Sequence, residues 1–567
     1  MEEHAPLRAP ESGRATFQNS EYPQGIHRQM SEDTDSGRFT LSQGPRPTEF
    51  KITAVEPDEG APPERKRDYK GRIRTWPGIL LLIGIVGAAA ALITLGAIHS
   101  KDQSEALART YEENVAGARR IKDGLNSSDD IIDDDGQVGN PKKYPSMGCE
   151  LPDYLSKGGQ IWARSKNGTE VAVGIKGVNW FGMETGVAVP FGLWENQENG
   201  TSAYEVASFL ARNKFNSVRL PVCIKSILKD TPPQKDLVNL NSNRALNITT
   251  YMSTIKTIVQ SLAYRHVTVM ISLHTLDPKE SGGAWYSDDL GVSEDDFLKA
   301  VDILTKNLCS SEYWNILGLD LKNEPHECSW GGADPDWQKG ATLIGNRMLE
   351  GCPNWLAFVE GINGNYKINL DGTSKVYYDW WGGGLEKAGA NPVELKTDNK
   401  VVYAPHYYNT GVTPAWYLYG GGTAGPDSTI VDYVELDDET LKFNVNATMW
   451  AMFSYLSARN KEAIILGEFA GLYATDKHPK KTTKRTTDFT IQSAIATGLA
   501  GGYMWSLNPE SAYQYNPADT KGTFTEGLLT DDWLTPDSEF LTGMAALDQI
   551  RDLKMFPCFP EEVSSRN

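Results

Sequence analysis

The sequence has little positive charge for its size. It holds 55 Lys and Arg against 74 Asp and Glu, a formal net charge of −19 over 567 residues. A chain this acidic repels phosphate backbones, so we expect no nucleic-acid partner. The sequence also lacks a Gly-x-Ser-x-Gly nucleophile motif, Cys-x-x-Cys pairs and a glycine-rich phosphate loop after its first apolar run. These absences argue against a serine nucleophile, a cysteine-bound metal site and nucleotide binding, in that order. We therefore expect neither a metal site nor a cofactor.

Charge is absent from one long apolar segment. No Asp, Glu, Lys or Arg lies between Arg74 and Lys101, and residues 76–98 are almost all apolar. At about 1.5 Å per residue, a helix of this length spans the roughly 30 Å hydrocarbon layer of a membrane. A signal peptide has a shorter apolar region that lies nearer the first residue. The segment therefore predicts a transmembrane helix at 76–98, with the lipid bilayer as a partner.

The flanks of this segment predict its orientation. Six basic residues crowd the N-terminal side: Arg65, Lys66, Arg67, Lys70, Arg72 and Arg74. On the other side Lys101 is soon followed by Asp102 and Glu105. Since positive flanks stay inside, the N-terminus is predicted to be cytoplasmic and the rest extracellular, at the plasma membrane. Residues 1–75 are polar and lack apolar periodicity, which predicts a disordered cytoplasmic tail.

Glycosylation motifs and cysteines occur only after the apolar segment. Asn-x-Ser/Thr motifs lie at Asn126, Asn167, Asn199, Asn247 and Asn446. The cysteines are Cys149, Cys223, Cys309, Cys328, Cys352 and Cys558. This distribution is typical of a glycosylated, disulfide-bonded extracellular part. Six cysteines allow fifteen pairings. Our hypothesis joins Cys149 to Cys558, near the two ends of that part, and Cys223 to Cys328.

Residues 99–145 are predicted to form an extracellular stalk. Residues 102–124 have the thin apolar stripe of a polar helix, and five aspartates follow between residues 129 and 135. Like charges repel one another and extend a chain, so the acidic run favours a spacer.

Residues 146–560 alternate between strand and helix patterns. Short apolar runs lie near residues 171–178, 217–220, 267–273, 316–321, 355–359, 400–404, 463–466 and 502–505. Helical patterns lie between some of them, at 203–213, 248–264, 294–308, 338–350 and 448–458. This order predicts an α/β fold, a parallel sheet with helices outside. Eight strands favour a (β/α)8 TIM barrel. An open doubly wound sheet is the alternative.

Polar residues follow these runs, at the rim where a barrel binds its substrate. Glu324 and Glu468 each end an apolar strand, where a buried charge is costly unless it is paired or used. Two carboxyl groups across a cleft are the equipment of glycoside hydrolysis, one to donate a proton and one to attack the sugar. Arg219 and Tyr408 would hold Glu468 ionised, and Trp505 would face a sugar ring. Other aromatic residues after the strands are candidates for outer subsites or for ordinary packing: Trp180, Phe181, Trp285, Trp381 and Trp416.

Three short motifs carry a family resemblance. Arg219-Leu220-Pro221, Asn323-Glu324-Pro325 and Gly467-Glu468-Phe469 stand in this order, with two histidines, a tyrosine and a tryptophan at other strand ends. Over about residues 150–550 the chain resembles glycoside hydrolase family 5, the cellulase family. The resemblance implies a (β/α)8 barrel and a retaining mechanism with Glu324 as acid/base and Glu468 as nucleophile. It implies a sugar-binding shell of Arg219, His274, Asn323, His406, Tyr408 and Trp505.

The resemblance also implies a polysaccharide substrate, a β-linked glucan. We expect an endo-β-1,4-glucanase that needs no cofactor. Exo-β-1,3-glucanase and β-mannanase activity remain open, as does a catalytically silent glycan-binding protein at the cell surface.

Overall fold

The computed structural model describes residues 76–561 except 119, 126–129, 197, 371 and 379, and it describes no side chains at 104–118, 365 and 375–378. The predicted tail at residues 1–75 and the motif at Asn126 lie outside the described residues. Helix α1 falls mainly in one compact unit, and the chain from residue 112 onward falls in another.

Helix α1 (Trp76–Ala118) is one continuous helix of 43 residues. Its first 28 residues, Trp76–Gln103, have a mean hydropathy of 2.6, so by length and composition they are sufficient to cross a membrane. Apolar side chains such as Leu92 and Ile93 are exposed. The predicted transmembrane segment and most of the predicted polar helix therefore form one element, which ends at Ala118 rather than near Gly124.

Residues 120–125 and 130–145, which we name the strap, pack against the main domain at residues 146–560. The side chain of Ile121 is buried, and the N–H of Lys122 donates to the carbonyl of Leu534 at 2.7 Å. The Asp123 carboxylate pairs with Arg212 at 2.8 Å, and both side chains are almost fully buried. The start of the strap is thus held by apolar contact and by charge.

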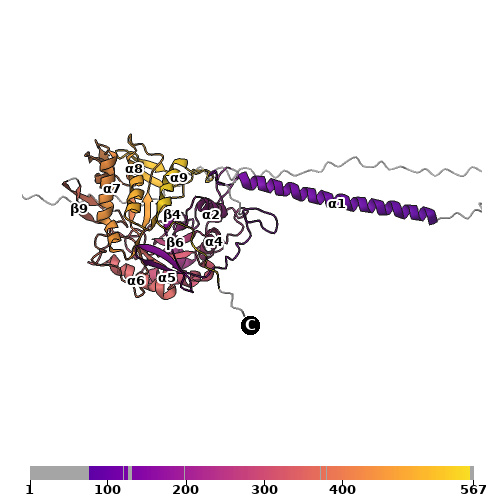
Figure 1. Cartoon of the computed structure of the whole chain (residues 1–567), viewed down its shortest axis with the longest axis horizontal. Coiled ribbons are helices and arrows are strands. Elements are labelled where there is room, and N and C mark those ends of the chain that lie inside the picture. Colours follow the sequence, from indigo (N-terminus) through magenta and orange to yellow (C-terminus); the bar gives the residue numbers. More distant parts are fainter. Residues whose placement is uncertain are drawn as a thin grey trace, which may run out of the picture. The chain divides into compact units, whose positions relative to one another are not determined.

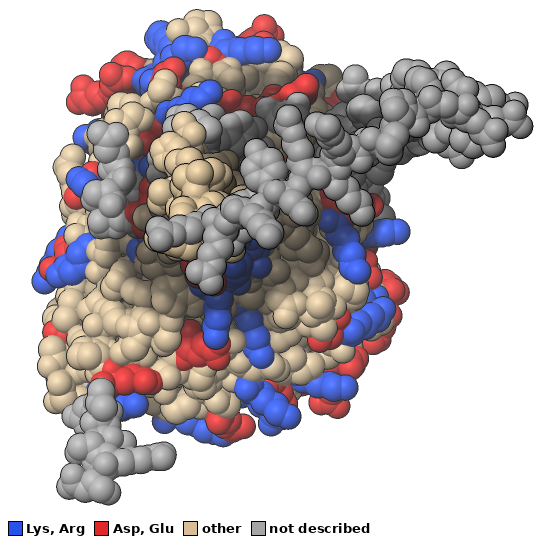
Figure 2. Space-filling model, turned by 90° about the vertical axis from the view of Figure 1, so that its right-hand side faces the viewer, with Lys and Arg blue, Asp and Glu red and all other residues tan. Residues whose placement is uncertain are grey.

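The acidic run inside the strap is neutralised rather than extended. Arg244 pairs with Asp133 at 3.0 Å and with Asp135 at 2.5 Å. Lys142 pairs with Asp134 at 2.6 Å. A hydrogen bond from Arg244 lowers the pKa of Asp135. This differs from the extended spacer that the sequence predicts, because the spacing of like charges along the chain does not reveal the cations they meet in space. Acidic and basic side chains also lie mixed around the edges of the face in Figure 2.

The main domain is built on a curled parallel sheet of ten strands, in the order β12-β16-β17-β4-β5-β6-β7-β8-β11-β15. The strands are β4 (Ile175–Asn179), β5 (Ser217–Cys223), β6 (Thr268–Thr275), β7 (Ile316–Asp320), β8 (Leu356–Val359), β11 (Val401–Tyr403), β12 (His406–Tyr408), β15 (Ala463–Ile464), β16 (Leu466–Ala470) and β17 (Gly501–Trp505). β11 pairs with β15, and β12 pairs with β16. The sheet is consistent with a TIM-like (β/α)8 fold.

Helices follow most of these strands and cover the sheet (Figure 1). They are α2 (Ala203–Arg212), α3 (Ile224–Lys229), α4 (Tyr251–Ala263), α5 (Glu294–Leu308), α6 (Trp337–Gly351), α7 (Asp438–Met452), α8 (Thr482–Ala496) and α9 (Ser538–Met544). Ser293 caps α5 through a capping box with Asp296, and α5 buries a stripe that includes Phe297, Val301 and Leu304. The helix predicted at 448–458 instead ends at Met452, and a 3-10 helix (Ser454–Arg459) follows.

The first predicted strand, at residues 171–178, covers two strands of different sheets, β3 and β4. β1 (Asp153–Lys157), β2 (Gln160–Arg164) and β3 (Glu170–Val173) form a separate antiparallel sheet, while β4 belongs to the main sheet. Gly174 separates β3 from β4, and a Cβ at this position would collide with the backbone of Arg551. Smaller hairpins are β9 (Asn365–Leu370) with β10 (Thr373–Tyr378), β13 (Thr423–Ala424) with β14 (Ile430–Val431), and β18 (Ala512–Tyr515) with β19 (Lys521–Thr525).

Two disulfides join the main domain, Cys149–Cys558 and Cys309–Cys352. The first confirms the predicted pair. The predicted Cys223–Cys328 bond is wrong, since both thiols are free. Cys223 is buried at the end of β5 and faces the carbonyl of Leu276, whereas Cys328 faces the carbonyls of Gly283 and His326. Cys309 and Cys352 cap the ends of the neighbouring helices α5 and α6, with Cα atoms 5.6 Å apart.

Candidate active site

The eight predicted site residues all belong to the parallel sheet. Six lie in its strands, and two lie just after one of them. Arg219 lies in β5, His274 in β6, Asn323 and Glu324 just after β7, His406 and Tyr408 in β12, Glu468 in β16 and Trp505 in β17. Parallel strands expose their carboxyl ends at one edge of the sheet, so side chains there converge although they are far apart in sequence. Seven of the eight are buried, and Glu324 is partly exposed.

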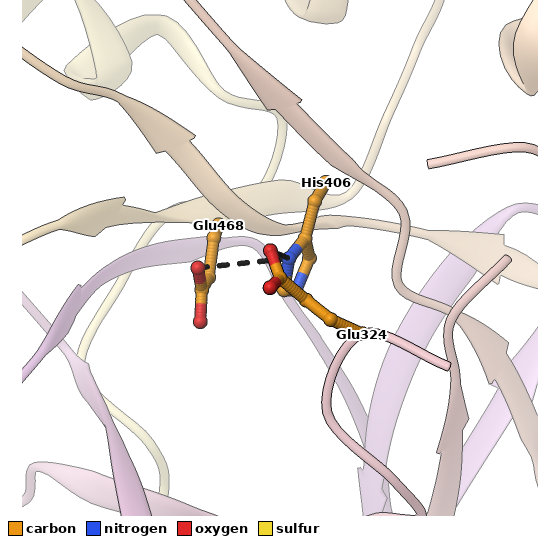
Figure 3. Close-up of side chains that lie close together, drawn as sticks. All are labelled: Glu324, His406 and Glu468. Carbon is orange, nitrogen blue, oxygen red and sulfur yellow. Dashed lines mark hydrogen bonds and ion pairs between the residues drawn. The ribbon is translucent and has the colours of Figure 1, made fainter. Parts of the chain in front are cut away.

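Glu324, His406 and Glu468 point toward one another (Figure 3). One carboxylate oxygen of Glu324, one of Glu468 and a ring nitrogen of His406 lie within 4.8 Å of one another. The Nδ1 atom of His406 is 3.2 Å from Oε1 of Glu324 and 3.6 Å from Oε2 of Glu468. Retaining glycosidases place their two carboxyl groups about 5–5.5 Å apart, and inverting ones place them about 6.5–9.5 Å apart to admit a water. The separation here fits the retaining geometry.

Glu468 is a buried carboxylate with several polar contacts. The Arg219 guanidinium donates to its Oε1, and the Tyr408 hydroxyl donates to its Oε2. Burial raises the pKa of Glu468, while His406, Arg219 and the Tyr408 hydrogen bond lower it, and the net shift is upward. The predicted contacts with Arg219 and Tyr408 are present, but they offset the effect of burial rather than exceed it.

Arg219 is fully buried and contacts three carboxylates. It pairs with Asp320 at 2.6 Å, with Glu360 at 3.1 Å and with Glu468. It also donates to the side-chain oxygens of Asn179 at 3.0 Å and Asn323 at 2.7 Å. Burial opposes its charge, but these carboxylates, Glu468 foremost, raise the pKa of Arg219. The side chain is a fixed cation behind the site.

The sequence analysis missed Glu360, which directly follows β8 and is fully buried. Its Oε1 lies 3.0 Å from Nε2 of His406, and its Oε2 accepts the backbone N–H of Glu324 at 2.7 Å. Burial and the neighbouring Asp320 raise the pKa of Glu360, while His406 and Arg219 oppose this shift. A signal was available, because Glu360 follows an apolar run just as Glu324 and Glu468 do.

His406 lies among carboxylates on both sides of its ring. Burial disfavours the charged ring, but Glu360 and Glu468 outweigh this effect and raise the pKa of His406 well above its usual value. The ring is therefore a cation between the two candidate catalytic carboxyl groups. His274 differs, since burial and the charge of Arg219 lower its pKa well below the usual value.

Some of the aromatic candidates are packed in the core, and others lie near the candidate catalytic residues. Trp505 is 7% exposed, and its ring lies nearly parallel to those of Phe181 and His274, with centroid distances of 5.4 and 6.0 Å. Trp180 and Trp285 are buried core residues. Trp381 stacks on His326, which directly follows Glu324-Pro325, at 3.8 Å between ring centroids. Trp416 is 44% exposed.

Two groups of described acidic or histidine side chains are close enough to share a cation. They are Glu324 with His406 and Glu468, and Asp133 with Asp134 and Asp135. The first group already contains a cationic ring and contacts Arg219, and the second is paired by Arg244 and Lys142. In both groups cations of the protein itself offset the negative charge that would attract a metal ion.

Two carboxyl groups at this separation, at the carboxyl ends of a TIM-like parallel sheet, define a glycoside hydrolase. Residues 165–511 match the family model described as Cellulase (glycosyl hydrolase family 5), so the chain belongs to this family.

Known endoglucanases are similar to the same part of the chain. The major extracellular endoglucanase of Xanthomonas campestris pv. campestris is 28% identical over 378 residues, covering 66% of this chain and 68% of that protein. An endoglucanase of Paenibacillus polymyxa is 28% identical over 388 residues, covering 67% and 83%. A structure of the endocellulase from Pyrococcus horikoshii in complex with cellotetraose has a TM-score of 0.56 and 26% identity, covering 70% of this chain and 99% of that chain.

Proposed function

We propose that this protein is a retaining endo-β-1,4-glucanase that cleaves β-glucan polysaccharide. The observation that carries the proposal is the approach of the Glu324 and Glu468 carboxylates to within 4.8 Å at the carboxyl edge of the sheet. The similar proteins of known name are endoglucanases, and one solved relative is bound to cellotetraose. These names favour an internal cut in a β-1,4-linked glucan over the exo-β-1,3-glucanase and β-mannanase alternatives.

The proposed reaction has two displacements. In the first, the Glu468 carboxylate forms a bond to the anomeric carbon while the glycosidic bond breaks, and the Glu324 carboxyl group gives its proton to the leaving oxygen. In the second, the Glu324 carboxylate takes a proton from water, and this water attacks the anomeric carbon and releases Glu468. Atoms balance with one water consumed, and the anomeric configuration is retained.

The remaining polar residues hold these two groups and the sugar. Arg219 and Tyr408 stabilise the ionised form of Glu468, to which both donate. His406 places a positive charge beside both carboxyl groups. The side-chain oxygen of Asn323 accepts a hydrogen bond from Arg219, so its NH2 group would donate to the 2-hydroxyl of the sugar. His274 and Trp505, with rings almost parallel, would contact the sugar ring at the reactive subsite.

The wider architecture is also part of the proposal. Two residues separate β11 from β12, and one residue separates β15 from β16. β11 pairs with β15 and β12 pairs with β16, so the two interrupted strands lie side by side. This pairing supports a closed (β/α)8 barrel of eight strands at residues 146–560. Residues 76–98 of α1 would anchor it in the plasma membrane, with residues 1–75 cytoplasmic and residues 99–145 linking anchor and barrel outside the cell. Asn167, Asn247 and Asn446 are exposed, as glycosylation requires.

Hydrolysis of a soluble β-1,4-glucan with sizing of the products tests the proposal. The full chain in detergent should release mixed oligosaccharides and rapidly shorten the polymer, while Glu468→Gln should lower the rate at least about a thousandfold. Mannan and β-1,3-glucan serve as parallel substrates. Release of single sugars from chain ends, or a higher rate on mannan or β-1,3-glucan, contradicts the substrate and mode of cutting. Equal rates for the two proteins contradict the mechanism and favour a glycan-binding protein.

A further inference from the structure

Glu360 lies behind the two candidate catalytic carboxyl groups and contacts the residues that hold them. Its Oε1 faces Arg219 at 3.1 Å and His406 at 3.0 Å, and its Oε2 accepts the backbone N–H of Glu324 at 2.7 Å. Arg219 and the N–H of Glu324 donate hydrogen bonds to Glu360, and Nε2 of His406 adds a charge contact. A fully buried carboxylate is costly unless its contacts repay its desolvation, and here every contact leads to the reaction site.

The surrounding backbone encloses Glu360. Gly382 has a φ of +75°, and a Cβ at this position would collide with Oε2 of Glu360. The Gly382 carbonyl accepts from the N–H of Gly361 at 2.7 Å and from the N–H of His406 at 3.3 Å. The loop therefore covers the Glu360 carboxylate with backbone and leaves no space for a larger side chain.

We propose that Glu360 is a positioning residue of the glycosidase reaction, fixing the backbone of Glu324 and the ring of His406 against the two catalytic carboxyl groups. The inference rests on the proposed function. Glu360 does not reach the reacting atoms itself. It acts through Glu324, whose φ of 46° lies in the left-handed region, and through His406, which contacts Glu324 and Glu468 on its other side.

The charge of Glu360 has a predictable effect on the pH profile. Among the carboxylates, Glu360 contributes most to the raised pKa of His406, so removing its charge should lower that pKa. A ring that loses its proton more easily attracts the Glu468 carboxylate less, so the pKa of Glu468 should rise. The acidic limb of the activity profile, which follows the ionisation of Glu468, should then move to higher pH. The other ionisable groups around Glu360 and His406 are Arg219, Asp320, Lys322, Glu324, Tyr408 and Glu468. His274 is also close, but its depressed pKa keeps it neutral.

Glu360→Gln keeps the shape and removes the charge. We expect kcat on a β-1,4-glucan to fall about ten- to a hundredfold with KM changed less than threefold, and the optimum of kcat/KM to rise by at least half a pH unit. Glu360→Asp keeps the charge, so it should lower kcat with the optimum unmoved. Glu205→Gln is the matched control, because buried Glu205 also accepts from an arginine, Arg212, and from a backbone N–H, that of Ile121, but lies on α2 away from the site. It should leave kcat and the optimum unchanged.

Several outcomes overturn the inference. If Glu360→Gln keeps the wild-type pH profile, Glu360 has only a structural role and the inference is wrong. A shift of the profile to lower pH contradicts the charge argument. If Glu360→Gln does not fold, a Glu360→Asp optimum that moves by half a unit or more is decisive against it. If the wild-type chain does not cut β-1,4-glucan at all, the proposed function has failed instead, and this result is distinct because it precedes any variant.

Discussion

At the scale of single residues, the hydroxyl of Tyr408 is one hydrogen bond whose loss should be measurable. It donates to Oε2 of Glu468 and lowers the pKa of that carboxyl group. Tyr408→Phe should therefore raise the pKa of Glu468, so that the acidic limb of kcat/KM moves to higher pH. Hydrogen bonds to charged groups contribute about 1.5–3 kcal/mol, which corresponds to about a ten- to hundredfold loss of kcat. A pH series of initial rates checks both effects.

The neighbouring Tyr407 provides the control. Its hydroxyl contacts the hydroxyl of Thr448 at 2.9 Å, away from Glu468, and the side chain is fully buried. Tyr407→Phe removes the same atom from the same strand and should cost stability without moving the acidic limb. If both variants move the limb equally, the contact between Tyr408 and Glu468 is not the cause.

The candidate residues were predictable because parallel strands bring their carboxyl ends together. Glu324 and Glu468 stand within three residues of the end of an apolar run, and the family resemblance assigned them their roles. The contacts behind them were not predictable in the same way. Asp320 and Asn179 lie within strands whose sequence looks ordinary, and only the strand register places both against Arg219. A polar residue inside an apolar run gives no sign of which partner it will meet.

At the scale of elements, the strap makes a prediction through its buried ion pair. Asp123 accepts from Arg212 at 2.8 Å and from Asn213 at 3.1 Å, and its side chain is 2% exposed. Asp123→Asn should loosen the first residues of the strap by about 1.5–3 kcal/mol, because buried Arg212 loses one of its two carboxylate partners and keeps only Glu205. Faster hydrogen exchange at Lys122, whose N–H donates to Leu534, measures this loss. Lys142→Gln is the control, since its partner Asp134 is exposed and the exchange should be unchanged.

The disulfide between α5 and α6 gives a second prediction at this scale. Cys309–Cys352 closes a loop of 43 residues, for which chain entropy contributes about 4 kcal/mol to stability. Replacing both cysteines by serine should lower the melting temperature clearly, with kcat kept below that temperature because the bond lies at the ends of outer helices. Cys328→Ser, at a free thiol, is the comparison. An unchanged melting temperature for the double variant would contradict the argument.

Elements were easier to predict than their boundaries. Each of the eight apolar runs overlaps at least one strand of the main sheet. The first run failed at its boundary, since Gly174 separates two strands of different sheets inside it. Helix α8 was missed because threonines supply much of its buried face, and threonine is a weak helix former whose methyl group is not counted as apolar. The buried threonines of α8 are Thr482, Thr483, Thr486, Thr487 and Thr490.

At the scale of the whole molecule, the proposed anchor predicts how the protein partitions. A chain that begins at residue 120 keeps the strap, both disulfides and all eight predicted site residues, but lacks the apolar helix. It should stay in the aqueous phase after alkaline extraction of membranes, whereas the full chain should remain with the lipid. Its kcat on a soluble β-glucan should be within twofold of the full chain. A full chain recovered in the aqueous phase would contradict the anchor.

The bond between Cys149 and Cys558 joins positions 409 residues apart, near both ends of the main domain. A single proteolytic nick in any loop between these cysteines therefore leaves two fragments that stay covalently linked until a reductant is added. Releasing an intact hydrolase from helix α1 therefore needs a cut on the N-terminal side of Cys149. There a protease meets the strap, whose acidic side chains are paired with Arg244 and Lys142.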